Sequence, residues 1–241
     1  MDKIIYGTYD ELSAAAAAIL AGRIKEKPDC VLGLATGSTP IGMYKSLVDM
    51  YISGVLDFSG VRTFNLDEYY PIKNDDKQSY GYFMREHLFS HVNIPSENIH
   101  LLHGDCVDAE AECAAYEKTI KETGGIDIQV LGIGSEGHIA FNEAGKELAL
   151  RTHVEELSPS TIAANARFFS NMEEVPKRAL TMGMASILDA KAILLLITGA
   201  AKASAAKQLF SGWVSPELPA SFLQLHPDVT VLLDAAAASL L

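Results

Sequence analysis

The feature that most constrains the fold is an alternation of short apolar runs with longer helix-like segments along nearly the whole chain. Most of the runs are continuously apolar, as in strands that are buried on both faces of a sheet. The expected strands are Lys3–Tyr6, Val31–Ala35, Arg62–Asn65, Ile126–Ile133, Ala192–Thr198 and Val229–Leu233. The expected helices between them are Tyr9–Lys25, Ile41–Ser53, Ser79–His91, Ala109–Thr123 and Ala201–Gly212. This order predicts an α/β fold with a mostly parallel sheet flanked by helices.

The composition favours a single compact domain that acts on small molecules. Hydrophobic residues make up 49% of the 241 residues, and no repeat or flexible linker divides residues 1–241. The net charge of −12 argues against nucleic acids and acidic membranes as partners, since both require a basic surface. There is no signal-peptide pattern and no apolar run of about 18 residues that could span a membrane. Three cysteines without C-x-x-C spacing lead us to expect a reducing, cytoplasmic setting.

Three polar, glycine-containing loops follow predicted strands. They read ATGSTP at 35–40, NLDEYYP at 65–71 and GSEGHIAFNEAG at 134–145. Ligands of open parallel sheets bind at the carboxyl ends of the strands. We therefore expect the three loops to line one crevice.

The first loop has the composition of an anion site. Gly37 permits a tight turn, Ser38 and Thr39 supply hydroxyl donors, and the following helix contributes free amides. The loop lacks the G-x-x-x-x-G-K-[ST] pattern of a Walker A motif. The alternative is an ordinary helix start, with Ser38 or Thr39 as the N-cap.

The second loop carries adjacent carboxylates, Asp67 and Glu68. A carboxylate at a strand end in partly apolar surroundings can have a raised pKa and act as a base. Because the two are neighbours, we expect them to point in different directions, with only one facing a ligand. The alternative is a carboxylate that only caps a helix or a turn.

The third loop begins with Gly132, Gly134 and Gly137, the G-x-G-x-x-G spacing of dinucleotide-binding proteins. That function requires a helix directly after the glycines, and here Gly145 interrupts the next segment within eight residues. The expected acidic residue at the end of a second strand is also missing. We therefore interpret the glycines as allowing close approach of the backbone to a ligand.

The same loop places His138 between two carboxylates, Glu136 and Glu143. A carboxylate beside a histidine orients the ring and raises its pKa, which is typical of an acid/base pair. The spacing is not that of a zinc site, and no second histidine lies nearby in the sequence. The alternative is a histidine with a purely structural role.

Taken in order, these loops make the chain resemble the glucosamine-6-phosphate deaminase family. The matching stretches are LGLATGSTP, TFNLDEYY, SYGYFM, IHLL, LGIGSEGHIAFNE, ANARFF, VPKRALTMG, GAAKA and LQLHP, between about Val31 and Pro227. The resemblance implies a Rossmann-like sheet and an enzyme of amino sugar catabolism. Its reaction converts D-glucosamine 6-phosphate and water to D-fructose 6-phosphate and ammonium, with no metal and no organic cofactor.

The resemblance also implies residue roles. Asp67 resembles the base that moves a proton between C2 and C1 through an enediol intermediate, and His138 resembles the acid that opens the sugar ring. Glu143 resembles the carboxylate that orients this histidine. Glu136 stands where the family has Asp or Asn, which leaves its contact with His138 open. The residues similar to the phosphate-binding set are Gly37, Ser38, Thr39, Arg167 and Lys202.

Two further expectations come from the resemblance. The chain ends at Leu241, as in short members of the family that lack allosteric regulation, so we expect a monomer with a lid at about residues 154–175. Ala144 replaces the proline of the usual FNEP stretch. The rival functions are a hydrolase like 6-phosphogluconolactonase, which needs no base at C2, and a regulatory domain that binds sugar phosphates. Asp67 favours the deaminase, and the absence of a basic DNA-binding segment disfavours the regulator.

Overall fold

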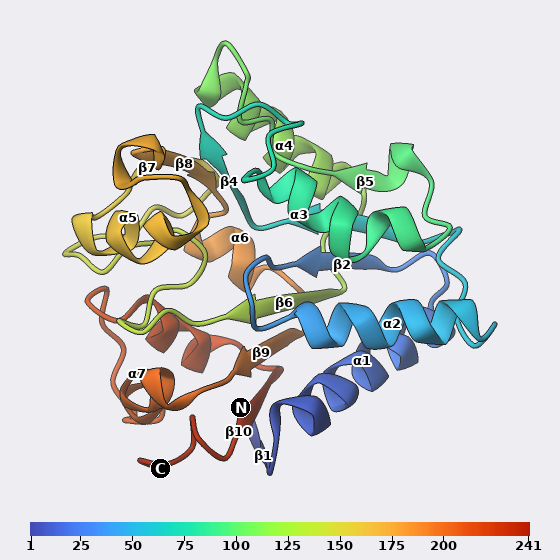
Figure 1. The fold of residues 1–241 in the computed structure, drawn as a ribbon. Helices are drawn as coiled ribbons and strands as arrows, with labels where there is room; N and C mark the ends of the chain where they lie inside the picture. Colours follow the sequence, from blue (N-terminus) through green and yellow to red (C-terminus); the bar gives the residue numbers. More distant parts are fainter.

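The computed structural model describes residues 1–241 and contains one large parallel sheet, as predicted (Figure 1). Its seven strands lie in the order β1-β10-β9-β6-β2-β3-β5, and every neighbouring pair is parallel. Their bounds are β1 (Asp2–Tyr6), β2 (Val31–Leu34), β3 (Arg62–Asn65), β5 (Ile99–His100), β6 (Ile128–Gly132), β9 (Ile193–Ile197) and β10 (Val229–Asp234). All six predicted strands are present to within about two residues at each end. Only the two-residue β5 was missed.

Helices cover the sheet, and all five predicted ones are found. The seven α-helices are α1 (Tyr9–Glu26), α2 (Ile41–Ile52), α3 (Tyr80–His87), α4 (Ala109–Glu122), α5 (Pro159–Asn165), α6 (Met184–Leu188) and α7 (Ala203–Leu209). A capping box of Thr8 and Glu11 begins α1, which packs along α2 (Figure 1). The predicted helix Ser79–His91 ends as an α-helix at His87, because Leu88 leaves the helical conformation before a 3₁₀ turn at Phe89–His91.

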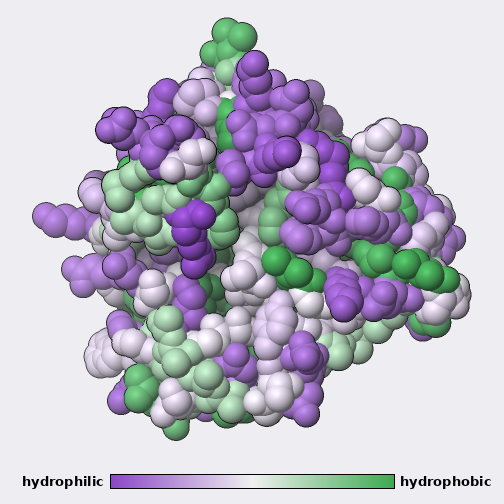
Figure 2. Space-filling view, in the orientation of Figure 1, coloured by the Kyte–Doolittle hydropathy of each residue, from purple (hydrophilic) through white to green (hydrophobic).

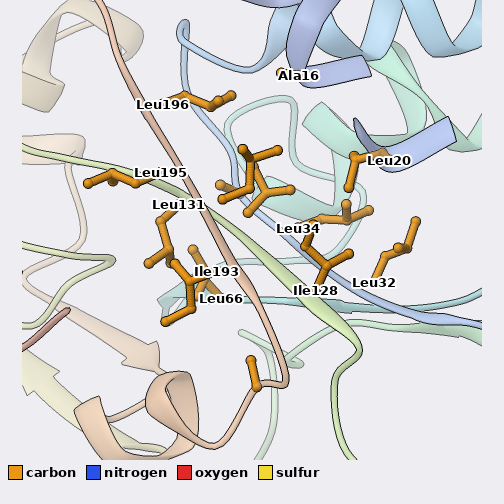
Figure 3. Close-up of a cluster of buried hydrophobic side chains, with 14 of the residues drawn as sticks. Ala16, Leu20, Leu32, Leu34, Leu66, Ile128, Leu131, Ile193, Leu195 and Leu196 are labelled. Carbon is orange, nitrogen blue, oxygen red and sulfur yellow. The ribbon is translucent and has the colours of Figure 1, made fainter. Parts of the chain in front are cut away.

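The core lies between the helices and the central strands. Every residue of β9, sequence ILLLI, is buried, as are all four residues of β2. Figure 3 shows side chains of β2, β6 and β9, among them Leu34, Leu131 and Leu195, gathered with Ala16 and Leu20 of α1. This burial on both faces explains why the strands read as continuous apolar runs. None of the helices has the length and apolar character that a membrane crossing requires.

A second, antiparallel sheet was not predicted. It consists of β4 (Asp67–Tyr70), β8 (Arg178–Thr181) and β7 (His153–Glu156), in the order β4-β8-β7. The expectation that residues 65–71 form only a loop is therefore wrong, since Asp67 is the first residue of a strand. Each strand has four residues and finds its partners far away in the sequence, so local patterns carry little signal for it.

The chain between β7 and β8 forms a separate cover over the carboxyl edge of the large sheet. It contains α5 and 3₁₀ turns at Ala166–Phe168 and Met172–Glu174. A small aromatic cluster holds it in place: Phe169 packs edge-on against Tyr69 of β4, with ring centroids 5.5 Å apart. Tyr80 and Phe141 complete this cluster from α3 and from the loop after β6. We call residues 154–175, which begin within β7, the lid segment.

Candidate active site

The large sheet brings the three predicted loops together. The strands that precede them, β3, β2 and β6, are adjacent and parallel, so their loops leave the same edge of the sheet. The next strand, β9, adds a fourth loop at residues 198–202, which carries Lys202. In Figure 1 this edge lies between α5 and α7. In Figure 2 strongly hydrophilic atoms lie there, between the paler surfaces over α5 and α7.

The first loop is held in a conformation that leaves its donors free. The Tyr9 hydroxyl of α1 lies 3.2 Å from the carbonyl of Ser38 and 3.1 Å from that of Thr39, and it accepts the Gly42 amide at 2.8 Å. The backbone amides of Gly37, Ser38 and Thr39 donate to no other residue of the protein. Gly37 has a φ of +94°, a conformation that favours glycine.

The alternative interpretation of this loop as an ordinary helix start is wrong. The N-cap of α2 is Pro40, and no side chain caps the helix. The hydroxyls of Ser38 and Thr39 are therefore not used in capping. Free amides and hydroxyls at a helix N-terminus are the donors that an anion requires.

Two cations approach this loop from other elements. Thr39 Oγ1 lies 3.4 Å from Thr198 Oγ1, which joins the first loop to the loop that carries Lys202. Burial lowers the pKa of Lys202, and the nearby positive charge of Arg167 lowers it further. Neither cation forms an ion pair within the chain, so the acidic protein holds two uncompensated positive charges here. Arg167 comes from the lid segment, in the 3₁₀ turn after α5.

Asp67 has the properties of a base held out of water. It is 7% exposed, and its carboxylate forms no hydrogen bond within the chain. Burial, with a smaller contribution from the charge of Glu68, raises its pKa well above the ordinary value. It lies opposite Thr181 in the second sheet and directly after β3. A carboxylate in this state binds a proton more tightly than an exposed one.

Glu68 faces elsewhere, as expected for the next residue of a strand. Its carboxylate accepts backbone N–H groups from Tyr69, Tyr80 and Gly81 at 2.9, 2.9 and 3.0 Å. Burial raises its pKa to about 7, while these hydrogen bonds oppose the shift. Glu68 thus fastens β4 to the N-terminus of α3 and leaves Asp67 as the carboxylate available to a ligand.

The third loop passes very close to its own histidine. A Cβ on Gly134 would lie 2.2 Å from the His138 ring, so only glycine fits there. Gly137 has a φ of +87° and packs against Leu218. The loop is tied to the end of β8, where the Phe141 amide donates to Thr181 Oγ1 at 3.2 Å. No helix follows the glycines, which confirms that the motif is not a dinucleotide-binding turn.

The pKa of His138 differs from the sequence-based expectation. Burial lowers it below the ordinary histidine value, and Lys202 lowers it further, while Glu143 and, more weakly, Glu136 raise it. The prediction that the carboxylates would leave the pKa raised is therefore wrong, because the cost of burying the charged ring is larger. Both carboxylates and Lys202 therefore lie close enough to the imidazole for their charges to act on it.

Neither carboxylate forms a hydrogen bond with the imidazole in this structure. Instead, both reach the start of α5 in the lid segment. The Ser158 amide donates to Glu143 Oε1 at 3.3 Å, and the Ser160 hydroxyl donates to Glu136 Oε2 at 3.3 Å. Glu143 is half-buried and Glu136 is exposed.

All nine predicted site residues thus lie at the carboxyl edge of the large sheet or in the lid segment above it, with Asp67 at the start of β4 and the others in loops or short 3₁₀ turns. The contributions of Tyr9, Thr181 and Thr198 were not foreseen. Thr198 had a detectable signal, as a hydroxyl residue at the end of an apolar strand, whereas the other two act through contacts distant in sequence. A surface cavity of about 790 Å³ lies beside Phe169 and Ser170, and Asp67, His138 and Lys202 do not line it. No group of three or more His, Cys, Asp or Glu side chains is placed to hold a metal ion.

Comparisons with known proteins agree with this geometry. Residues 7–232 match the family described as glucosamine-6-phosphate isomerases/6-phosphogluconolactonase. Glucosamine-6-phosphate deaminase of Clostridioides difficile is 54% identical, over 99% of this chain and 96% of the relative. That of Thermoanaerobacter pseudethanolicus is 52% identical, over 100% and 95%.

Solved structures divide into a near and a distant group. A monomeric glucosamine-6-phosphate deaminase superposes with a TM-score of 0.98 at 48% identity, over 100% of both chains. The 6-phosphogluconolactonase of Trypanosoma cruzi superposes with a TM-score of 0.80 at 24% identity, over 99% and 96%, and shares the fold alone. Identity above one half to deaminases over the whole length, with the site residues gathered at one edge, shows that this chain belongs to the glucosamine-6-phosphate deaminase family.

Proposed function

We propose that the protein converts D-glucosamine 6-phosphate and water to D-fructose 6-phosphate and ammonium. The observation that carries the proposal is Asp67, a buried carboxylate without a hydrogen-bond partner beside an anion-binding loop. Relatives at 52–54% identity that bear the name glucosamine-6-phosphate deaminase support the same reaction.

The phosphate of the substrate binds at the first and fourth loops. The free amides of Gly37, Ser38 and Thr39 donate to its oxygens, and Lys202 and Arg167 balance its charge. Binding there relieves the repulsion between the two cations. Because Arg167 belongs to the lid segment, the phosphate also draws residues 154–175 toward the sheet, and these residues act as a lid.

The remaining groups act on the sugar. His138, oriented by Glu143, donates a proton to the ring oxygen as its bond to C1 breaks, and the C1 hydroxyl gives up its proton to water as the aldehyde forms. Asp67 then removes the proton from C2 while the C1 carbonyl oxygen takes up a proton from water, and Asp67 returns its proton to C1 of the resulting enolamine, which leaves an imine at C2. Water adds to the imine formed at C2, and the C–N bond breaks to release ammonium and the ketose. The raised pKa of Asp67 suits this step, because a stronger base removes a carbon-bound proton more readily.

The rival reaction is hydrolysis of a phosphorylated sugar lactone. It requires the phosphate loop and the histidine, but it has no proton to move between two carbons. A buried, unpartnered Asp67 has no task in that reaction, which is why the site favours the deaminase.

The test is a coupled assay of the purified protein with glucosamine 6-phosphate. We expect ammonium and fructose 6-phosphate to form in equal amounts, with no change after treatment with EDTA. Hydrolysis of 6-phosphogluconolactone without ammonium release from the amino sugar would instead support the rival. Tight binding of glucosamine 6-phosphate without turnover of either compound would indicate a regulatory domain.

The proposal extends to assembly and location. We propose a monomer that works in the cytoplasm, supported by the solved relative described as monomeric and by three free cysteines. A monomer with one site gives a hyperbolic substrate curve. The same assay should therefore show no sigmoidality and no response to N-acetylglucosamine 6-phosphate.

A further inference from the structure

The first turn of α5 contacts both carboxylates that flank His138. Besides the bonds to Glu143 and Glu136, the hydroxyls of Ser158 and Ser160 lie 2.9 Å apart. Ser158 Oγ also caps α5 by accepting the Thr161 amide at 3.2 Å. Two polar contacts thus connect the start of the lid segment to the third loop, and two more hold Ser158 and Ser160 in place at the start of α5.

The two carboxylates use this turn in different ways. Glu143 accepts a backbone amide, a contact that any residue at position 158 except proline would supply. Glu136 accepts a side-chain hydroxyl, forms no other hydrogen bond or ion pair, and is exposed. The contact of Glu136 with the lid segment therefore depends on the identities of two side chains.

The reach of Glu136 is also specific. An aspartate at position 136 would be shorter by one methylene, about 1.5 Å, and could not span the present distance to Ser160. From a contact of 3.3 Å, the separation would exceed that of a hydrogen bond. The glutamate therefore has the length that this contact needs.

We propose that Ser160 and Glu136 form a latch that holds the lid segment over the third loop, and that Glu136 is a positioning residue for the lid. Its carboxylate is directed to Ser160, while Glu143 is the carboxylate with the larger influence on His138. Only the predicted effect of the latch on substrate binding rests on the proposed function.

The consequence follows from where the lid segment carries its charge. Arg167 lies seven positions after Ser160, in the turn that follows α5, and its charge reaches Lys202. At its other end the segment is held by Phe169 against Tyr69. Releasing the latch frees the start of α5, so Arg167 is held less firmly near the phosphate loop. The expected result is a higher KM with a smaller change in kcat.

The test compares Ser160→Ala, Glu136→Asp and the double variant with Ser170→Ala. Ser170 is an exposed serine of the same segment that forms no hydrogen bond, so it controls for the loss of a hydroxyl. Hydrogen exchange of residues 158–170 is measured without substrate, which makes it independent of the reaction. We expect exchange to rise about two- to tenfold in both single variants, as for loss of one hydrogen bond, and not in the control.

The double variant decides whether the two residues act together. If they form a latch, the second change adds nothing to the first, in exchange or in KM. Glu136→Gln retains an oxygen acceptor for the Ser160 hydroxyl, so exchange in this variant should stay close to that of the wild type. Unchanged exchange in Ser160→Ala, or additive effects in the double variant, would overturn the latch. Failure of the wild-type protein to release ammonium would contradict the proposed function. The exchange measurement would still test the latch, because it is made without substrate.

Discussion

At the scale of single residues, the environment of His138 is the feature most open to a quantitative test. An acid that opens the ring must be protonated, so activity falls as pH rises through its pKa. Burial and Lys202 lower this pKa, and Glu143 is the largest influence that raises it. The basic limb of the kcat/KM profile should therefore lie below the range usual for histidine.

Two variants should shift this limb in opposite directions. Glu143→Gln removes an influence that raises the pKa of His138, so the limb moves to lower pH. Lys202→Ala removes one that lowers it, so the limb moves to higher pH, together with a higher KM from the lost phosphate contact. The pH dependence of kcat/KM measures both. Shifts in the same direction would show that another group sets the limb.

The gathering of the proposed site residues at one edge of the sheet was predictable from sequence. Gly37, Asp67 and His138 each follow the end of a buried strand by two to six residues, and ligands of open parallel sheets bind at these strand ends. The sign of the pKa shift of His138 was not readable. It depends on how deeply the ring is buried, and that is set by packing from Gly134 and from elements distant in the chain.

At the scale of elements, the first loop depends on a helix that contributes nothing to the chemistry. Tyr9, the first residue of α1, lies close to two carbonyls of the loop and binds the Gly42 amide. It thereby fixes the orientation of the peptide groups whose amides remain free for phosphate. Tyr9→Phe keeps the ring and removes these bonds.

We expect Tyr9→Phe to raise the KM for glucosamine 6-phosphate about three- to tenfold, as for the loss of about one hydrogen bond's contribution, with little change in kcat. Steady-state kinetics measure the KM. The matched control is Tyr6→Phe, because the hydroxyl of Tyr6 forms no hydrogen bond. Equal KM values in the two variants would mean that the loop holds its conformation without Tyr9.

Elements differed in how far sequence could predict them. The central strands of the large sheet were predictable because both of their faces are buried, as in β9, where all five residues are apolar. The strands β4, β7 and β8 were missed, because their sequences DEYY, HVEE and RALT are not continuous apolar runs and β7 is only partly buried. The sequence therefore placed Asp67 correctly after the carboxyl end of β3, but its position in a second sheet was missed.

At the scale of the whole molecule, one buried carboxylate fastens the edge of the sheet opposite the site. Asp127 precedes β6 and pairs with Lys27 after α1 and Lys191 before β9, both at 2.7 Å, and it accepts the Val31 amide at 2.8 Å. These bonds lower its pKa to about 2, against the opposing effect of burial. One residue thus connects the starts of three neighbouring strands.

Asp127→Asn should lower the free energy of unfolding by about 2 kcal/mol at neutral pH, from the difference between the ordinary and the lowered pKa. Because the folded pKa is the lower one, the stabilisation is full above about pH 4 and is lost as pH falls toward about 2. Urea denaturation at pH 7 and pH 3 measures it. The wild type and the variant should differ less at pH 3, and an equal difference at both would contradict the account.

The fold as a whole does not decide the reaction. The 6-phosphogluconolactonase structure shares it at a TM-score of 0.80 with 24% identity. We propose that the distinction lies in a few side chains at the carboxyl edge, and above all in Asp67.

The most direct test of the central claim is therefore the turnover of Asp67→Asn with glucosamine 6-phosphate. The amide keeps the shape of the side chain but cannot take up the C2 proton, so ammonium release should fall by about 10²- to 10⁴-fold while binding of the substrate is largely retained. Calorimetric titration with glucosamine 6-phosphate checks the binding. Ammonium release close to that of the wild type would contradict the assignment of Asp67 as the base.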